Sequence, residues 1–575
     1  MPHRNRRMMW TGVLLGAAGL LVISGGRALA DEAASVAAGP PTSADWPQWR
    51  GPTRDGIAGP GPKLANAWPK DGPKLLWKSG PIPATGNCYA FNGGSGSVAV
   101  SGGRAFVFVN TLSVVKLVDT KDLNDLGWEE GIPDDLGKKL DKEWEANRDK
   151  WRKLKPEEWD AYLKDYLATL DPETVKKFGS FITKRMNQMK RGNPVYNSGA
   201  EVQWTPWDSL MKLAAIRGKK FTSHDELNRL LDDGLHMGHG GPLMGAGGML
   251  KVRCFSYMDA VICLDAATGK EIWRKDFPGE SGAGHRWTGG WAASSTPAIC
   301  DDKCYVTGSA GTYCLSVKDG GLIWQAKTRD TSSSPLVANG TVFFVDGGDS
   351  ADSALVAYDA NNGKLLWRQP KVRATLTSPV AWTCGGKDYL IVDGVGGPFC
   401  VDPETGAIVG QNGKLGGDMQ FSTPAINGDV MVLLAGGGGL RAYRLVPEKL
   451  DVIWKADKNG DRGGSVAIYQ DHVYTGGQAF NGGPACVDIK TGEMKWKARE
   501  GEECSSPVVA DGKVFFQLSR EGHVAMFKAT PEKYEELGRF NPHMADCSSP
   551  AIAGGKLFLR LQDCVACYDL TASGN

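Results

Sequence analysis

A short line of residues recurs along the C-terminal half of this chain and constrains its fold more than any other feature. In "ACVDIKTGEMKW", residues 485–496, an Asp precedes a Thr-Gly pair, and a Trp follows four residues after the Gly. Each such line is preceded by an element of the type "SSTPAI", and consecutive copies of that element begin 38 to 45 residues apart from Ser294 onward. This period fits four short strands with their turns, which predicts the blades of a β-propeller. Related lines end at Trp273, Trp324, Trp367, Val409, Trp454 and Leu537, and a last one runs into the C-terminus.

The number of repeats predicts eight blades. The "SSTPAI" element occurs eight times, counting a degenerate "SGSVAV" from Ser95, whereas the fourth-strand position occurs only seven times after residue 250. The missing fourth strand is present at the other end of the chain, in "PKLLWKSG" around Trp77. An N-terminal strand that completes the last blade closes the ring without leaving an open sheet edge. We therefore expect an all-β, eight-bladed propeller closed by this strand, with seven blades as the alternative.

The residues of the repeated motif can be explained by structure alone. A Trp on the outer strand can dock between neighbouring blades, Thr-Gly supplies a tight turn, and Asp accepts backbone N–H groups within that turn. We expect the 13 Cys residues to act mainly as small buried side chains, because most of them fall at repeated strand positions. Cys300 and Cys304 flank a turn, which leaves a local disulfide open. The structural role is assigned to Asp265, Gly269, Trp273, Trp324, Trp367, Trp454, Asp488, Gly492, Trp496 and Trp77.

The chain divides into five parts by composition. Residues 1–30 combine Arg residues, an apolar run and an Ala-Leu-Ala end, the pattern of an export signal that is removed. Residues 31–71 form an N-terminal extension, and residues 72–118 start the propeller with the closing strand and the beginning of blade 1. Residues 119–249 are largely charged and amphipathic, which predicts a helical insert, and residues 250–575 hold the remainder of the propeller. We expect a periplasmic or secreted protein without a stable membrane span, an uncleaved anchor being the alternative.

The charge balance excludes one class of partner. Lys and Arg number 66 against 65 Asp and Glu, which gives a formal net charge of +1. Without a basic excess, nothing in the bulk charge argues for nucleic acid, so no nucleic-acid partner is expected. No phosphate loop, nucleophile elbow or zinc signature is present, and no metal site is predicted.

The blade signature resembles the tryptophan-docking motif of the quinoprotein alcohol-dehydrogenase-like propellers. The pattern A-x-D-x-x-T-G-x-x-x-W is met almost fully by "LDAATGKEIW" and "VDIKTGEMKW", and the resemblance covers about residues 72–116 and 250–575. This superfamily includes dehydrogenases that use pyrroloquinoline quinone (PQQ) and the propeller subunit of the bacterial outer-membrane β-barrel assembly machine. "DWPQWRGPTRDG", residues 45–56, is similar to the N-terminal stretch of secreted bacterial PQQ-like repeat proteins. The resemblance implies the fold, and one fold serves many functions.

Unrepeated polar residues stand where each innermost strand begins. Because strands of a blade are antiparallel, these residues share one face of the ring with the connection that carries the helical insert. A quinoprotein dehydrogenase implies Ca²⁺ held by oxygen ligands beside PQQ, and an Asp base. Glu503 and Asp546 form an acidic pair on adjacent blades and are the candidate catalytic residues. The candidate cofactor-binding residues at the same polar mouth are Arg286, Asp330, Gln420 and Arg462.

Two hypotheses follow for the function. The first is an exported binding or scaffold module whose mouth and helical insert bind a protein partner or a small molecule, with no cofactor assigned. The alternative is a PQQ- and Ca²⁺-dependent dehydrogenase that oxidises an alcohol or a sugar. The adjacent-Cys disulfide ring of such enzymes is absent and no haem motif is present, which favours the first hypothesis. Another enzyme built on the propeller, such as a lyase or a hydrolase, ranks third.

Overall fold

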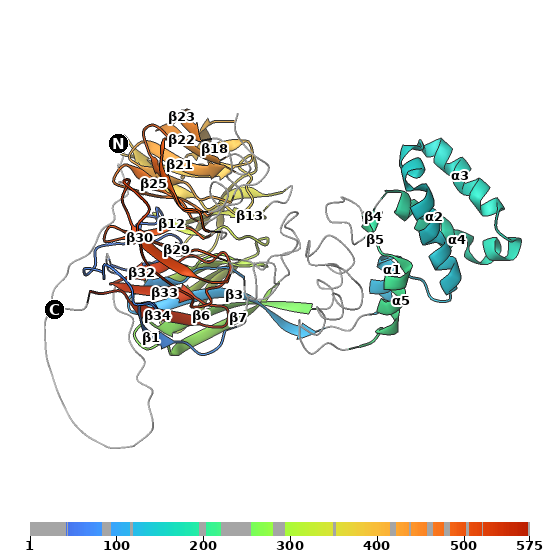
Figure 1. Cartoon of the computed structure of the whole chain (residues 1–575), viewed down its shortest axis with the longest axis horizontal. Coiled ribbons are helices and arrows are strands. Elements are labelled where there is room, and N and C mark those ends of the chain that lie inside the picture. The colour runs from blue at the N-terminus through green and yellow to red at the C-terminus, as the bar shows by residue number, and fades with distance from the viewer. Residues whose placement is uncertain are drawn as a thin grey trace, which may run out of the picture. The chain divides into compact units, whose positions relative to one another are not determined.

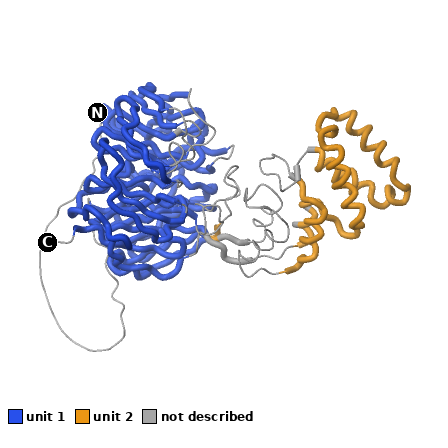
Figure 2. Tube along the Cα trace, viewed as in Figure 1, with its two compact units in different colours: residues 1–110, 259–277, 292–575 blue, residues 111–258, 278–291 orange. Residues whose placement is uncertain are grey.

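The structure is a computed structural model of the whole chain. It describes residues 42, 44–82, 94–115, 119–191, 193–194, 203–219, 255–279, 294–348, 352–413, 421–435, 439–456, 464–476, 483–501, 505–519 and 521–572. The predicted export signal lies outside these residues. The described chain forms two compact units, one of β-sheet and one mainly of helices (Figure 2).

The first unit is an eight-bladed β-propeller, as the repeats predict (Figure 1). The described residues form eight four-stranded antiparallel sheets, and we call their strands A to D from the ring axis outwards. Blade 1 contains β2 (Ala99–Ser101), β3 (Arg104–Val115), β6 (Phe255–Asp265) and β7 (Glu271–Gly279); blade 2 contains β8 (Ala298–Cys300), β9 (Lys303–Thr307), β10 (Thr312–Ser316) and β11 (Leu322–Ala326); blade 3 contains β12 (Leu336–Ala338), β13 (Thr341–Asp346), β14 (Ala354–Asp359) and β15 (Leu365–Gln369); blade 4 contains β16 (Val380–Cys384), β17 (Lys387–Gly394), β18 (Gly397–Val401) and β19 (Ile408–Gln411).

The remaining blades complete the ring. Blade 5 contains β20 (Ala425–Asn427), β21 (Val430–Ala435), β22 (Gly439–Val446) and β23 (Lys449–Ala456); blade 6 contains β24 (Ala467–Tyr469), β25 (His472–Tyr474), β26 (Ala485–Asp488) and β27 (Met494–Lys497); blade 7 contains β28 (Val508–Ala510), β29 (Lys513–Gln517), β30 (Val524–Lys528) and β31 (Glu536–Phe540); blade 8 contains β32 (Ala551–Ala553), β33 (Lys556–Arg560), β34 (Val565–Asp569) and β1 (Lys74–Lys78). In blade 8, β1 pairs with β34 and places Trp77 opposite Cys567. The N-terminal strand therefore closes the ring, as expected.

The A strands are joined by hydroxyl groups of the "SSTPAI" element. Its third residue is Ser or Thr in every blade, and its side-chain oxygen accepts the backbone N–H of the third residue in the neighbouring blade. Seven such bonds, of 2.9 to 3.1 Å, follow the ring: Ser97 to Thr296, Thr296 to Ser334, Ser334 to Ser378, Thr423 to Ser465, Ser465 to Ser506, Ser506 to Ser549 and Ser549 to Ser97. Between blades 4 and 5, Thr377 Oγ1 donates to the carbonyl of Ser422 instead. We call this belt the hydroxyl ring.

The outer Trp of one blade docks on the C–D turn of the next. Trp496 Nε1 donates to the carbonyl of Thr530 at 2.7 Å, and Trp77 Nε1 donates to that of Ala266 at 3.1 Å. Gly269 has a φ of +74°, and a Cβ there would lie 2.4 Å from the Trp77 ring, so this position needs glycine for its turn and for its neighbour. The same donor bond is made by Trp273, Trp324, Trp367 and Trp454.

In blades 1, 3 and 6, the turn before the docked Trp is held by an Asp. Asp488 Oδ1 accepts hydrogen bonds from the backbone of Lys490 and from both the backbone and the hydroxyl of Thr491, at 2.9 to 3.1 Å. Asp265 makes the equivalent bonds in blade 1. The repeated Asp and Thr side chains therefore have a structural role, because their polar groups form hydrogen bonds within the turns.

Cys300 and Cys304 do not form the disulfide that the sequence left open. Both thiols are free, and Cys304 is buried. Cys304 stands opposite Ile299 on the neighbouring strand, while Cys300 stands opposite Lys303. Because successive side chains of a strand point to opposite faces, the two sulfurs lie on different faces of the sheet.

The second unit contains five described helices between β3 and β6: α1 (Thr120–Asp125), α2 (Asp134–Lys153), α3 (Pro156–Ala168), α4 (Pro172–Arg191) and α5 (Trp207–Ala215), with a short parallel pair of β4 (Asn193–Pro194) and β5 (Gln203–Trp204). Its core is aromatic, and the buried Arg185 guanidinium lies 5.5 Å from the ring centre of Trp204 and 5.4 Å from that of Trp207. Arg185 also pairs with Asp141 at 2.5 Å. None of the described helices is both long and apolar enough to cross a membrane.

Candidate functional site at the B–C face

Strand polarity gives the ring two different faces. The A–B and C–D turns share one face, which we call the turn face, and the B–C connections share the other, which we call the B–C face. Of the predicted mouth residues, Asp330 and Asp546 are described; the first is half-buried and the second is 2% exposed. Arg286, Gln420, Arg462 and Glu503 lie outside the described residues, and so does the predicted pairing of Glu503 with Asp546.

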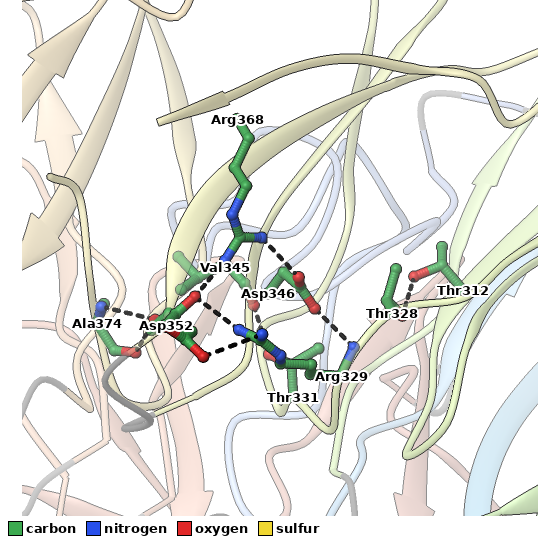
Figure 3. Close-up of polar contacts among 10 residues, drawn as sticks. Thr312, Thr328, Arg329, Thr331, Val345, Asp346, Asp352, Arg368 and Ala374 are labelled. Atoms are coloured by element: carbon green, nitrogen blue, oxygen red, sulfur yellow. Dashed lines mark hydrogen bonds and ion pairs between the residues drawn. The ribbon is translucent and has the colours of Figure 1, made fainter. Parts of the chain in front are cut away.

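The segment that carries Asp330 is fixed by a charged network in blade 3 (Figure 3). The backbone N–H of Arg329 donates to Asp346 Oδ1 at 2.7 Å, and Arg368 Nη1 donates to Asp346 Oδ2 at 2.9 Å. Arg329 also binds Asp352, through its carboxylate at 3.1 Å and its carbonyl at 2.9 Å. The positive charges of Arg329 and Arg368 are thus balanced by the negative charges of Asp346, at the end of β13, and Asp352, in the B–C connection.

On the other side of Asp330, a hydroxyl group completes the support. Thr331 Oγ1 donates to the carbonyl of Val345 at 2.6 Å (Figure 3). Asp330 therefore stands between two neighbours that are both tied to strand β13. Such support restrains the backbone at Asp330, and a binding position needs a rigid backbone.

The segment that carries Asp546 packs on the B–C turn of blade 7. Met544 N donates to the carbonyl of Gly522 at 3.2 Å, and Ala545 N donates to that of Arg560 at 2.9 Å. A Cβ on Gly522 would lie 2.4 Å from Met544 N, so the close approach needs this glycine. The same turn holds Ser519 Oγ 3.0 Å from His523 Nδ1. These two polar side chains were not predicted, because no repeat aligns them.

A buried carboxylate marks the point where the chain returns to blade 1. Asp259 is fully buried and accepts hydrogen bonds from Asn110 Nδ2 at 2.8 Å, from Ser309 Oγ at 2.7 Å and N at 2.8 Å, and from Tyr313 Oη at 3.1 Å. Burial raises the pKa of Asp259, and the four donors oppose that shift. The cluster joins strands β3 and β6, between which the helical unit is inserted, to Ser309 and Tyr313 of blade 2.

Further buried polar residues share one register position on the B strands. Asp393, Gln517 and Arg560 each stand two residues beyond the residue that pairs with the first residue of strand A. Burial raises the pKa of Asp393 to about 8, against the opposing effect of Arg441, and burial lowers the pKa of Arg560 to about 10. The sequence did carry a signal for them, since blades 1, 3 and 5 have apolar residues at this position: Phe108, Val345 and Leu434.

The described residues do not by themselves fit PQQ with Ca²⁺. In the part of the chain that the structure describes, no group of three or more His, Cys, Asp or Glu side chains is placed to hold a metal ion. Calcium needs six to eight oxygen ligands, and the described mouth offers separate carboxylates on blades 3 and 8 rather than such a cluster. No step of a dehydrogenase reaction follows from these residues.

Comparison with known families gives the chain its place. The family model described as "Outer membrane protein assembly factor BamB" matches residues 258–497 and 449–563, which together make up more than half of the chain. The chain belongs to this family. The match covers strands of all eight blades and leaves out most of the helical unit.

Curated relatives match over shorter stretches. The outer membrane protein assembly factor BamB of Shewanella oneidensis is 29% identical over 181 residues, which are 31% of this chain and 43% of that protein. Quinohemoprotein alcohol dehydrogenase ADH IIB of Pseudomonas putida is 36% identical over 117 residues, which are 19% of this chain and 17% of that protein. The chain thus spans less than half the length of these two relatives. Among solved structures, BamB of Moraxella catarrhalis aligns with a TM-score of 0.44 at 14% identity, over 55% of this chain and 90% of that one.

Proposed function

We propose that the protein is an exported binding or scaffold module of the periplasm or cell exterior, which binds a protein partner at its B–C face. The observation that carries this proposal is the separation of its polar groups. The repeated Asp, Thr, Ser and Trp groups are used in contacts within and between blades, whereas unrepeated polar residues of the blades, among them Asp330, Asp546 and His523, stand on the B–C face. A rigid ring with one unrepeated polar face is suited to recognition.

The organisation of the chain adds a second binding surface to this proposal. Residues 1–30 act as the export signal, residues 31–71 as the N-terminal extension, residues 72–118 and 250–575 as the propeller, and residues 119–249 as a helical insert that contributes to partner binding. The insert belongs to the B–C connection of blade 1, and the Asp259 cluster holds together the two strands, β3 and β6, that lead into and out of it.

The names of the relatives point to a class of partner. If the chain acts as its family name states, its loss lowers the amount of correctly assembled outer-membrane proteins. The test is deletion of the gene in the source bacterium, followed by mass spectrometry of the outer membrane. Full-length protein is expected to restore the amounts, and a chain without residues 119–249 is expected to fold but not to restore them. An unchanged outer membrane in the deletion strain would contradict this role.

The similarity to a quinohemoprotein alcohol dehydrogenase favours a second candidate function, the oxidation of an alcohol or sugar with PQQ and Ca²⁺. Calorimetric titration of the mature protein with PQQ in the presence of Ca²⁺, together with dye reduction by a panel of alcohols and sugars, separates the two. We expect neither binding nor turnover. Tight binding with turnover that is lost in Glu503→Ala or Asp546→Ala would replace the first proposal by the second.

A further inference from the structure

Residues 44–58, which contain the "DWPQWRGPTRDG" stretch, lie among the A strands of the propeller. We call them the axial segment. Hydrogen bonds within the described residues join it to seven blades: Trp46 to Val100 in blade 1, Pro47 to Ile299 in blade 2, Arg54 to Ser334 and Pro335 in blade 3, Trp49 to Thr423 in blade 5, Arg50 to Val466 in blade 6, Gly56 and Ala58 to Val509 in blade 7, and Ala44 to Gly554 in blade 8. A single segment can reach blades all round the ring only by crossing its axis.

Both ends of the axial segment lie at the turn face. At one end, Asp45 accepts hydrogen bonds from Ser101 and Gly102, which belong to the A–B turn of blade 1. Beyond the other end, Leu64 N donates to Asp511 Oδ2 at 2.9 Å in the A–B turn of blade 7. The segment therefore enters from the turn face and returns to it.

Between its ends the axial segment reaches the hydroxyl ring. Trp49 Nε1 donates to Thr423 Oγ1 at 3.0 Å, and Arg54 donates to the carbonyls of Ser334 at 3.1 Å and Pro335 at 2.8 Å. Thr423 and Ser334 are both third residues of the "SSTPAI" element, where the A strands of neighbouring blades are joined. The axial segment thus fills the ring from the turn face up to this level.

Two buried arginines anchor the axial segment to blades 3 and 6 of the ring. Arg50 and Arg54 are 2% and 1% exposed, and burial lowers the pKa of Arg50 to about 10 and that of Arg54 to about 9. Both stay charged at neutral pH. Burying a charge is costly unless hydrogen bonds replace its water, and backbone carbonyls of blades 3 and 6 do so here. Because the two guanidinium groups bind carbonyls of two separate blades, they hold the axial segment in one position.

Two glycines make this close fit feasible. Gly51 has a φ of +83°, and a Cβ there would lie 2.7 Å from the Trp46 ring. Gly56 has a φ of +85°, and a Cβ there would lie 2.9 Å from the carbonyl oxygen of Pro507. Both positions therefore need glycine for backbone conformation and for space.

We propose that the axial segment is a built-in plug, which closes the ring at the turn face, so that a ligand or a partner segment reaches the axis only from the B–C face. This inference holds whichever partner binds and does not rest on the proposed function.

The plug can be tested with a reporter thiol beneath it. Ala467 is fully buried, and its Cβ lies 3.4 Å from a Cβ built on Gly56. In the full exported chain carrying Ala467→Cys, maleimide labelling is followed site by site with peptide mass spectrometry. Adding Arg50→Ala and Arg54→Ala is expected to speed labelling of residue 467 about tenfold or more, because the segment that covers it is released. Cys547, half-buried on the B–C face, should label equally in both proteins, and the buried Cys486 of blade 6 should stay unlabelled.

Equal labelling of residue 467 in both proteins, with Cys486 still protected, would overturn the proposal. If Cys486 becomes labelled, the variant has unfolded, and amide hydrogen exchange on the unaltered protein decides instead. The N–H groups of Val100, Ile299, Val509 and Gly554 donate to the axial segment. They are expected to exchange as slowly as those inside the blades, and fast exchange at all four would show that no plug is in place.

Discussion

Both kinds of blade junction, those with the repeated outer Trp and those without it, contain a Trp between the two blades, but this Trp comes from different parts of the chain. Six junctions use the outer Trp on the next C–D turn, whereas blades 4 and 7 carry Gly410 and Gly538 at that register position, one residue after Val409 and Leu537. Between blades 7 and 8, the ring of Trp68 from the N-terminal extension packs on Phe540 at 5.4 Å, and the backbone N–H of Trp68 donates to the carbonyl of Leu537. Between blades 4 and 5, Trp382 of β16 donates to the carbonyl of Gly428. Every junction therefore contains a Trp, although at two of the eight junctions this Trp does not come from the repeated position.

The largest expected effect tests whether Trp68 replaces the repeated Trp. Trp496→Ala and Trp68→Ala each remove a nearly buried indole from a blade junction, and each is expected to lower the free energy of unfolding by about 3–5 kcal/mol. Guanidinium unfolding followed by circular dichroism measures both. Leu366→Ala is the control, because Leu366 is 49% exposed and should change stability by less than about 0.5 kcal/mol. A Trp68 variant as stable as that control would show that Trp68 does not replace the repeated Trp.

A pair of glycines in blade 3 separates the docking contact from backbone strain. Gly363 and Gly340 have nearly the same φ, +70° and +71°, but a Cβ on Gly363 would lie 2.6 Å from the Trp324 ring, while one on Gly340 meets nothing within 4 Å. Both alanine variants carry the backbone cost of about 1–2 kcal/mol. Gly363→Ala is expected to lose a further 1–3 kcal/mol, roughly, from overpacking. Equal melting temperatures for the two variants would mean that the Trp ring does not need this glycine.

A pH dependence distinguishes the unrepeated buried carboxyl from the repeated turn Asp residues. Asp393 has a pKa of about 8 in the folded protein, above the value of about 3.9 for an unfolded chain, so the folded state holds a proton that the unfolded state has lost between these values. Stability therefore falls as pH rises from about 4 to about 8, by up to about 1.4 kcal/mol per pH unit.

Asp393→Asn removes this titration, so its melting temperature should exceed that of the natural protein by an amount that grows between pH 5 and pH 8. In Asp488, by contrast, hydrogen bonds from Thr491 and Lys490 outweigh burial and lower the pKa. Asp488→Asn should therefore show no such growth over the same range. Parallel melting curves of natural and Asp393→Asn protein would contradict the assigned pKa.

The smallest effect concerns the hydroxyl ring. Ser506→Ala removes the acceptor of the Ser465 N–H and is expected to cost about 1 kcal/mol, since one buried donor is left without a partner. Ser332 occupies the first position of the same element in blade 3, and its buried hydroxyl has no partner among the described residues. Ser332→Ala should therefore be neutral or slightly stabilising in the same unfolding experiment. A Ser506 variant as stable as this control would show that the hydroxyl ring does not contribute to the stability of the propeller.

Periodicity explains why the fold was predictable and the site was not. Eight copies of the element and the strand around Trp77 predict eight blades and their closure, because a register repeated eight times leaves few alternatives. The roles of Trp68 and of the axial segment were not predicted, since neither is repeated and their contacts lie hundreds of residues away. Asp393 could have been found as a polar residue at an apolar register position.

The claim that the B–C face of the ring, and not its turn face, binds a partner can be tested within one blade. A photo-reactive amino acid is placed at Ser332, half-buried on the B–C face of blade 3, or at Asn362, exposed in its C–D turn on the turn face. Both proteins are cross-linked in the source bacterium and their adducts are weighed by mass spectrometry. We predict a discrete adduct from position 332 and none from position 362. An adduct from position 362 alone would contradict the account.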